Sequence, residues 1–267
     1  MIDAHHHYLP PGGDDVLFGP QAMEPGLYAQ RELEERLRAM DADGIEQAVI
    51  MPAHGYLRPN GIADTRRIND GVAAYQRARP DRFLVALAVA EPLFGAESLA
   101  EIERVRDGLG LAGVTFHTRF QGTPTDHRLV VALVERITEL GLIAFVHAGD
   151  SSEEEVWRIL NLARQVPDAA IVVLDAFDQL EKSNQALACA AMAQNLFFDT
   201  AGCWNFDYLL RFVARYGAER LVFGSNRYSS TTATKRQHVL PDLRAADLPD
   251  EDKHAIAAGN IRKLFGL

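Results

Sequence analysis

Three consecutive histidines, His5, His6 and His7, lie within the first ten residues, in the segment IDAHHHYLP. The segment is apolar at its start and has no helix-capping pattern, so it predicts a β-strand that leads into a loop. Because side chains on a strand alternate between its faces, we expect His5 and His7 on one face and His6 on the other. Two imidazoles on one face can bind one divalent cation, which makes His5 and His7 candidate metal ligands and His6 a structural residue. The alternatives are packed or solvated histidines, or an expression tag, which is normally a longer run.

Apolar runs typical of buried strands recur along the chain, and a helical pattern follows each of them. They begin near residues 2, 47, 83, 111, 143, 170, 196 and 221. Eight such βα units in 267 residues favour a closed (β/α)8 TIM barrel, in the α/β class, over an open doubly wound sheet. No Gly-rich dinucleotide or phosphate motif follows any of these strands, which also disfavours the open sheet. We therefore expect a single domain that covers residues 1–267.

One connection is long for this architecture. The segment Pro10 to Gln30 is rich in Gly, Pro and Asp, and we interpret it as a lid loop over the first strand. The spacing of apolar residues then predicts a helix from Arg31 to Asp41. Two further helical stretches, Lys235 to Ala246 and Asp250 to Ala258, are expected to close the chain.

Polar residues end several of the predicted strands. In a (β/α)8 barrel the carboxyl ends of the strands surround the active site, so these residues are expected to converge. They are His5 and His7, His117 followed by Arg119, His147, Asp175, and Asn226 followed by Arg227. Each alone is often a cap or a loop hydrogen-bonding group, but together three histidines and a carboxylate suit Zn²⁺, and also Fe²⁺ or Mn²⁺.

Several of these segments resemble the amidohydrolase superfamily, in particular the amidohydrolase-2 branch that includes aminocarboxymuconate-semialdehyde decarboxylase. The resemblance covers nearly the whole chain and rests on the segments IDAHHH, GVTFH with QG, FVHAG, LVFGSN and GNIRKLFGL. It implies one divalent metal ion, usually zinc, bound by His5, His7, His147 and an Asp that ends the eighth strand. It also implies hydrolysis or non-oxidative decarboxylation of small, often carboxylated or aromatic substrates.

Two residues depart from the pattern of that family. Asn226 replaces the Asp of the eighth strand, and Asp175 stands where the sixth strand commonly ends in a His. An amide cannot hold or transfer a proton as a carboxylate does. We therefore hypothesise that the carboxylate has moved from strand eight to strand six. Asp175 would be the fourth metal ligand or the general base, and Asn226 would orient water or substrate.

Three further side chains are candidates for substrate contact. Arg119 and Arg227 follow strand ends, where each is able to bind a substrate carboxylate, and the alternative for each is an ion pair within the protein. His117 is either a catalytic or substrate-contacting residue or a hydrogen-bonded residue at the barrel mouth.

Composition narrows the class of partner. The net charge is −10 and the basic residues are scattered, which disfavours nucleic acid and anionic membranes and favours a small-molecule substrate. The chain has only two cysteines, Cys189 and Cys203, which argues against a disulfide framework and for a reduced compartment. It has no apolar segment long enough to span a membrane, so we expect a cytoplasmic location. A homodimer is the default oligomer.

Three function classes follow from these features. The first is a metal-dependent hydrolase or non-oxidative decarboxylase, in which the metal polarises a carbonyl or activates a water. The second is an iron- or manganese-dependent oxidative enzyme on the same scaffold. The third is a catalytically impaired homologue that serves as a partner subunit, because the usual Asp of strand eight is missing.

Overall fold

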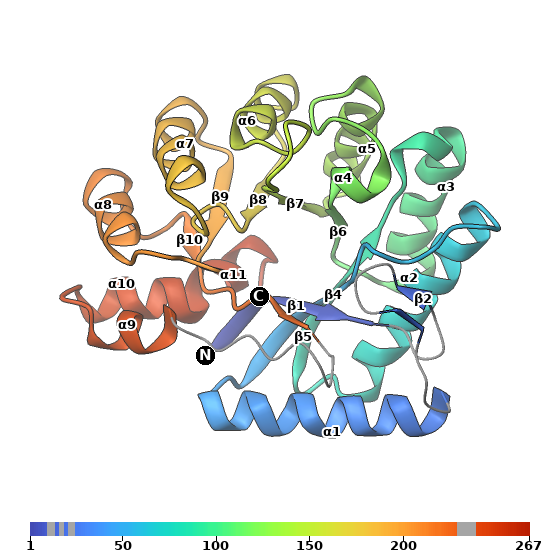
Figure 1. The fold of residues 1–267 in the computed structure, drawn as a ribbon, viewed down its shortest axis with the longest axis horizontal. Helices are drawn as coiled ribbons and strands as arrows, with labels where there is room; N and C mark the ends of the chain where they lie inside the picture. Colours follow the sequence, from blue (N-terminus) through green and yellow to red (C-terminus); the bar gives the residue numbers. More distant parts are fainter. Residues whose placement is uncertain (10–13, 16–18, 21–24, 229–238) are drawn as a thin grey trace.

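A computed structural model describes residues 1–9, 14–15, 19–20, 25–228 and 239–267. Eight parallel strands surround a common axis, and helices form a ring outside them (Figure 1), which confirms the predicted (β/α)8 barrel. The first seven strands of the barrel are β1 (Ile2–Tyr8), β4 (Gln47–Pro52), β5 (Phe83–Val89), β6 (Gly113–Phe116), β7 (Ile143–His147), β8 (Ile171–Leu174) and β9 (Leu196–Asp199). The eighth consists of two pieces, β10 (Leu221–Val222) and β11 (Arg227–Tyr228).

The eighth strand is interrupted, because β10 pairs with β9 whereas β11 pairs with β1. Between these two pieces the backbone N–H of Ala4 donates to the carbonyl of Phe223 at 2.8 Å, which joins the first strand to the last. Asn226 lies in this interruption with φ 51°, a left-handed conformation that Asn adopts more readily than most residues. The left-handed backbone at Asn226 therefore changes the direction of the chain between β10 and β11, while the hydrogen bond from Ala4 keeps the first and last strands together.

The helices agree with the predicted alternation, with shifts at their ends. They are α1 (Pro25–Asp43), α2 (Ile62–Ala78), α3 (Ala96–Arg104), α4 (Thr118–Gln121), α5 (Arg128–Glu139), α6 (Val156–Gln165), α7 (Leu180–Met192), α8 (Asp207–Tyr216), α9 (Val239–Ala245), α10 (Asp250–His254) and α11 (Asn260–Leu264). No helix in the described ranges is long and apolar enough to span a membrane.

The lid prediction is partly wrong. α1 begins at Pro25, so residues 25–30 form a helix and not a loop; a short antiparallel pair, β2 (Asp14–Asp15) with β3 (Gly19–Pro20), precedes it. The rest of the predicted lid, residues 10–13, 16–18 and 21–24, lies outside the described residues, as do residues 235–238 of the predicted helix that starts at Lys235.

Apolar side chains pack in two layers. The larger layer lies between the strands and the outer helices, and a smaller one fills the inside of the barrel. Inside the barrel, Phe265, just after α11, stacks on Phe145 with ring centroids 6.1 Å apart. Phe145 lies two residues before His147 on β7 and therefore points to the same face. The C-terminal segment thus fills the barrel beneath the histidines.

Candidate metal centre

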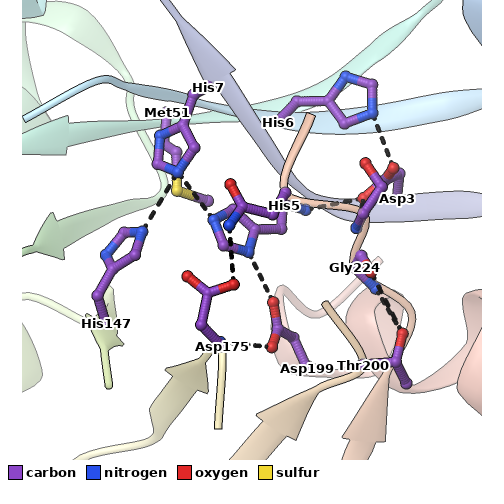
Figure 2. Close-up of polar contacts among 12 residues, drawn as sticks. Asp3, His5, His6, His7, Met51, His147, Asp175, Asp199, Thr200 and Gly224 are labelled. Carbon is purple, nitrogen blue, oxygen red and sulfur yellow. Dashed lines mark hydrogen bonds and ion pairs between the residues drawn. The ribbon is translucent and has the colours of Figure 1, made fainter. Parts of the chain in front are cut away.

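Three imidazoles converge inside the carboxyl end of the barrel (Figure 2). His5 and His7 come from β1 and His147 ends β7, and all three are buried. The Nε2 atom of His7 lies 2.8 Å from Nε2 of His5 and 3.2 Å from Nε2 of His147. The sequence predicted these three residues as ligands of one ion, and the structure brings their ring nitrogens together. We refer to them as the histidine triad.

The contacts of the Nδ1 atoms show whether each Nε2 atom carries a proton or a lone pair. The Nδ1 atoms of His7 and His147 lie 3.3 and 2.9 Å from the carbonyl oxygens of Pro52 and Phe116. A carbonyl oxygen only accepts hydrogen bonds, so each Nδ1 carries the proton, and each neutral ring has a lone pair on Nε2. Two lone pairs that face each other at 3.2 Å repel unless a cation lies between them. The triad is therefore arranged as a ligand set.

The charges around the triad support this reading. Burial lowers the pKa of His7 and of His147 well below the usual histidine value, and the neighbouring imidazoles lower it further, so both rings are neutral at pH 7. Burial also works against protonation of His5, but Asp175 and the hydrogen bond with Asp199 outweigh it and raise its pKa. Positive charge is thus favoured at one edge of the triad, on the side of the two carboxylates.

Asp199 orients His5. It ends β9, is fully buried, and its Oδ2 lies 2.7 Å from Nδ1 of His5, while its Oδ1 accepts from the backbone N–H of Asp175 at 2.9 Å. Gly224 makes room for this contact, because a Cβ there would lie 2.7 Å from Asp199 Oδ2 and 3.1 Å from His5 Cβ. A carboxylate behind a ligand histidine fixes its tautomer and raises its basicity. Our sequence analysis missed Asp199. The signal was present, because Asp199 is the last residue of β9, just as Asp175 comes directly after the last residue of β8.

Asp175 and Asn226 form a pair beside His5. Nδ2 of Asn226 donates to Oδ1 of Asp175 at 2.8 Å. The possible ligand atoms of His5, Asp175 and Asp199 all lie within 4.8 Å of one another. Asp175 and Asn226 are the two non-glycine residues with positive φ, at 60° and 51°, in the described part of the chain. Such backbone strain concentrates at functional sites.

The Asn226 side chain has one atom unmatched. Its Oδ1 is buried and has no hydrogen-bond partner among the residues that the structure describes. Since Nδ2 is committed to Asp175, this oxygen is the atom of Asn226 that remains available to a cation, a water or a substrate. The departure from the family pattern therefore lies next to the triad.

His6 points to the other face of β1, as predicted. Its Nε2 donates to Asp3 Oδ2 at 2.8 Å, and its Nδ1 accepts from Arg36 of α1 at 2.9 Å. The Oδ1 atom of Asp3 also accepts from the backbone N–H groups of His5 and Ser225. This cluster of Asp3, His6 and Arg36 therefore ties the ligand strand to the eighth strand and to α1.

His117 lies at the edge of the triad, with its ring parallel to that of His147 at a centroid distance of 4.6 Å. Its Nδ1 lies 2.5 Å from Oε1 of Glu154, which is fully buried. A further buried imidazole, His54, lies 5.3 Å from His147 between ring centroids. Glu154 and His54 were both missed from the sequence: Glu154 lies in a loop seven residues after the end of β7, whereas His54 follows β4 closely and its position after that apolar run was a signal that our sequence analysis did not use.

The two candidate arginines differ in their surroundings. Arg227 forms an ion pair with Asp43 of α1 at 2.8 Å, and this contact favours the ion-pair alternative over a substrate clamp. Arg119 is exposed, with its guanidinium over the ring of Phe120, so its proposed role in substrate binding stays a prediction. The two cysteines, Cys189 and Cys203, are buried and free.

The donor set fits a divalent cation. Three converging imidazole nitrogens, a carboxylate and a buried amide oxygen are the ligand types that Zn²⁺, Mn²⁺ and Fe²⁺ accept. A model of the amidohydrolase family matches residues 2–267. The chain belongs to the amidohydrolase family. This confirms the resemblance seen in the sequence and the expectation of an amidohydrolase-type enzyme.

Solved structures with a similar fold include two decarboxylases. A 2,6-dihydroxybenzoate decarboxylase from Rhizobium has a TM-score of 0.73 at 19% identity, with 99% of this chain and 98% of that chain covered. A 5-carboxyvanillate decarboxylase from Novosphingobium aromaticivorans, complexed with manganese and 4-hydroxy-3-methoxy-5-nitrobenzoic acid, has a TM-score of 0.74 at 16% identity, with 100% and 96% covered.

A 4-oxalomesaconate hydratase from Rhodopseudomonas palustris is similar to the same degree, with a TM-score of 0.73, 15% identity and coverage of 100% and 95%. No curated protein matches the chain in sequence. At these identities the likeness shows the shared barrel, and the chemistry has to be argued from the residues of this chain.

Proposed function

We propose that this chain is a metal-dependent, non-oxidative decarboxylase of small hydroxylated aromatic carboxylates. The observation that carries the proposal is the convergence of three imidazole Nε2 atoms at the carboxyl end of the barrel. The substrate class is suggested by the neighbours, two of which are decarboxylases of substituted benzoates. One divalent cation would be held by His5, His7 and His147, with Asp175 or the Oδ1 atom of Asn226 completing the set.

Zinc remains the first expectation for the ion, and manganese is the second because it is bound in the 5-carboxyvanillate decarboxylase. When bound, such a cation supplies electrostatic stabilisation of negative charge on a substrate oxygen. The protein supplies neutral imidazoles, since burial keeps His7 and His147 unprotonated. Asp199 holds His5 in the tautomer that leaves its Nε2 facing the other two rings.

Asp175 is the residue best placed to handle the proton. Loss of CO₂ leaves a carbon that must receive a proton, and a carboxyl group is a suitable donor. Asp199 is committed to His5 and to the backbone of Asp175, whereas Asp175 accepts only the amide of Asn226 in the described structure. We propose that Asp175 carries the carboxylate function that the family places on strand eight, and that Asn226 orients it.

Turnover tests this proposal. Metal-stripped protein is reloaded with Zn²⁺ or Mn²⁺, and CO₂ release and the aromatic product are followed over a series of hydroxybenzoates, with 2,6-dihydroxybenzoate as the first member. We expect metal-dependent CO₂ release, and a decrease of about 10²–10⁴-fold in kcat for Asp175→Asn. Asp70→Asn, which alters an exposed ion pair with Arg104, is the matched control. CO₂ release that is unchanged in Asp175→Asn would refute its role.

A reciprocal exchange tests the moved carboxylate separately from the substrate. Asp175→Asn removes the carboxylate, and the double variant Asp175→Asn with Asn226→Asp returns it to strand eight. We expect metal content, measured by elemental analysis after dialysis, to fall in the single variant and to recover in the double variant. If Asp175→Asn keeps both full metal content and full turnover, the carboxylate has not moved to strand six.

The other function classes give different outcomes in the same experiments. Consumption of an unsaturated or amide substrate without CO₂ would indicate hydration or hydrolysis, the first of which occurs in one neighbour. Stoichiometric iron after metal-free purification, with oxygen consumption, would indicate an oxidative enzyme. Full metal binding without turnover of any member of the series would indicate a partner subunit.

A further inference from the structure

A buried carboxylate that the proposed mechanism does not use, Glu154, faces the imidazole of His117. Glu154 lies in the loop after β7, has no exposed side-chain surface, and accepts at Oε1 from Nδ1 of His117 at 2.5 Å and from the backbone N–H of Arg119 at 2.7 Å. Its Oε2 is buried and has no hydrogen-bond partner among the described residues. A buried carboxylate is costly, so an arrangement of this kind is expected to have a role.

The position of His117 suggests what the role is. Its ring lies parallel to that of His147, with an interplanar angle of 7° and a centroid distance of 4.6 Å. The side chain is 13% exposed, whereas the triad is almost fully buried, so it lies at the boundary between the triad and solvent. With Nδ1 bound to Glu154, Nε2 is on the opposite edge of the ring, and no described residue hydrogen-bonds to it.

We infer that Glu154 is a positioning residue, which fixes His117 with the proton on Nδ1 and presents its Nε2 beside the cation site to a polar group of the substrate. The inference rests on the proposed function for the identity of that group, a hydroxyl or carboxylate of an aromatic acid. The fixed orientation of the ring rests on the contacts alone.

Gly149 supports this reading from the same loop. A Cβ at this position would lie 1.8 Å from Oε2 and 2.9 Å from Cδ of Glu154, which no side chain tolerates without displacing the carboxylate. The backbone N–H of Gly149 also donates to the carbonyl of Glu154 at 3.2 Å. Gly149 lies two residues after His147, and because it has no side chain, the Glu154 carboxylate occupies the space beside it. Gly149→Ala therefore moves the carboxylate while keeping its charge in the chain.

The tautomer of His117 is directly measurable. In full-length, zinc-loaded protein labelled with ¹⁵N-histidine, the imidazole ¹⁵N shifts distinguish a protonated from an unprotonated ring nitrogen, and His117→Gln assigns the signals. We expect Nδ1 of His117 to be protonated with a bias of about tenfold or more, the size expected for a hydrogen bond to a buried charged acceptor. An unprotonated Nδ1 in the wild type would overturn the inference.

His127 is an internal control in the same spectrum. Its Nδ1 accepts from the backbone N–H of Leu129 at the start of α5, so it carries the opposite tautomer. In Glu154→Ala the bias at His117 should disappear while the signals of His127 stay in place. Glu154→Gln, which keeps an oxygen acceptor, should retain most of the bias. If Glu154→Ala does not fold, Gly149→Ala gives the same comparison. A bias that survives in these two displacing variants would refute the role of Glu154.

Ligand addition tests the second half of the inference. On titration with 2,6-dihydroxybenzoate, the Nε2 signal of His117 should shift in the wild type, with little change at His127. Binding detected by calorimetry without a shift at His117 would show that Nε2 does not face the substrate. Absence of any binding would count against the proposed substrate class, and the tautomer measurement would still decide the role of Glu154.

Discussion

The two faces of β1 hold buried histidines in opposite states. On the outer face, both ring nitrogens of His6 are matched, since Nε2 donates to Asp3 and Nδ1 accepts from Arg36. On the inner face, His7 uses its Nδ1 on a carbonyl and directs Nε2 at two other rings. Burial and residue type are the same on the two faces. What distinguishes a metal site from a structural histidine here is where Nε2 points: at a carboxylate for His6, and at two other imidazoles for His7.

The largest effect should come from the inner face. His7→Ala removes the central imidazole and is expected to weaken Zn²⁺ or Mn²⁺ binding by about 10³-fold, since three or four ligands share a binding free energy of roughly 10–16 kcal/mol. Calorimetric titration of metal-stripped protein measures this loss. Thermal unfolding of the metal-free form should change little, because removal of one lone pair from the triad relieves repulsion. Undiminished metal affinity in His7→Ala would contradict the role of the triad.

Substitutions on the outer face of β1 should lower the free energy of unfolding more than they weaken metal binding. Asp3→Asn removes the charge and replaces one of the two acceptor oxygens by an NH₂ donor, so either His6 or the backbone N–H groups of His5 and Ser225 lose their acceptor. We expect a loss of about 3 kcal/mol in the free energy of unfolding, the upper end of the range for a buried hydrogen bond to a charged group. Urea denaturation measures it, with exposed Asp70→Asn as the control. A loss smaller than that of the control would show that this cluster is not structural.

Asp199 lies between these two cases, because it touches a ligand but not the expected ion. Asp199→Asn removes the charge behind Nδ1 of His5 and should weaken metal binding by about 10–100-fold, as for other partners of ligand histidines. The loss should be smaller than for His7→Ala in the same titration. An effect as large as that of His7→Ala would instead make Asp199 a direct ligand.

The smallest effect is expected for Arg227. Its ion pair with Asp43 is partly exposed, so Arg227→Gln should cost less than about 1 kcal/mol of stability and leave turnover unchanged. Urea denaturation and the CO₂ assay check both parts. An increase in KM of tenfold or more would return Arg227 to the substrate site, where our sequence analysis had placed it as one of two alternatives.

The barrel and the triad were predictable because both depend on patterns in the sequence. Eight apolar runs with helices between them require a closed sheet, and alternation along β1 separates His5 and His7 from His6. The partners of these residues were not predictable, because Asp199, Arg36 and Glu154 reach them across the fold. The contacts of Asp199 and Glu154 depend on close approaches at Gly224 and Gly149, which no local pattern reveals.

The contact between Asp175 and Asn226 shows the same limit. The sequence shows that Asp175 and Asn226 depart from the family, and it does not show that their side chains touch. That contact depends on the left-handed backbone at both residues and on the break between β10 and β11. A departure from a motif can therefore be found in the sequence, but the contacts of the departing residues have to be found in three dimensions.

The most direct test of the account is X-ray absorption at the zinc edge of zinc-loaded protein, with His6→Gln and His7→Ala measured alongside the wild type. We predict a first shell with three imidazole nitrogens at about 2.0–2.1 Å in the wild type and in His6→Gln, and two in His7→Ala. A wild-type protein that retains no zinc, or binds it with fewer than three imidazoles, would contradict the central claim that the triad shares one cation.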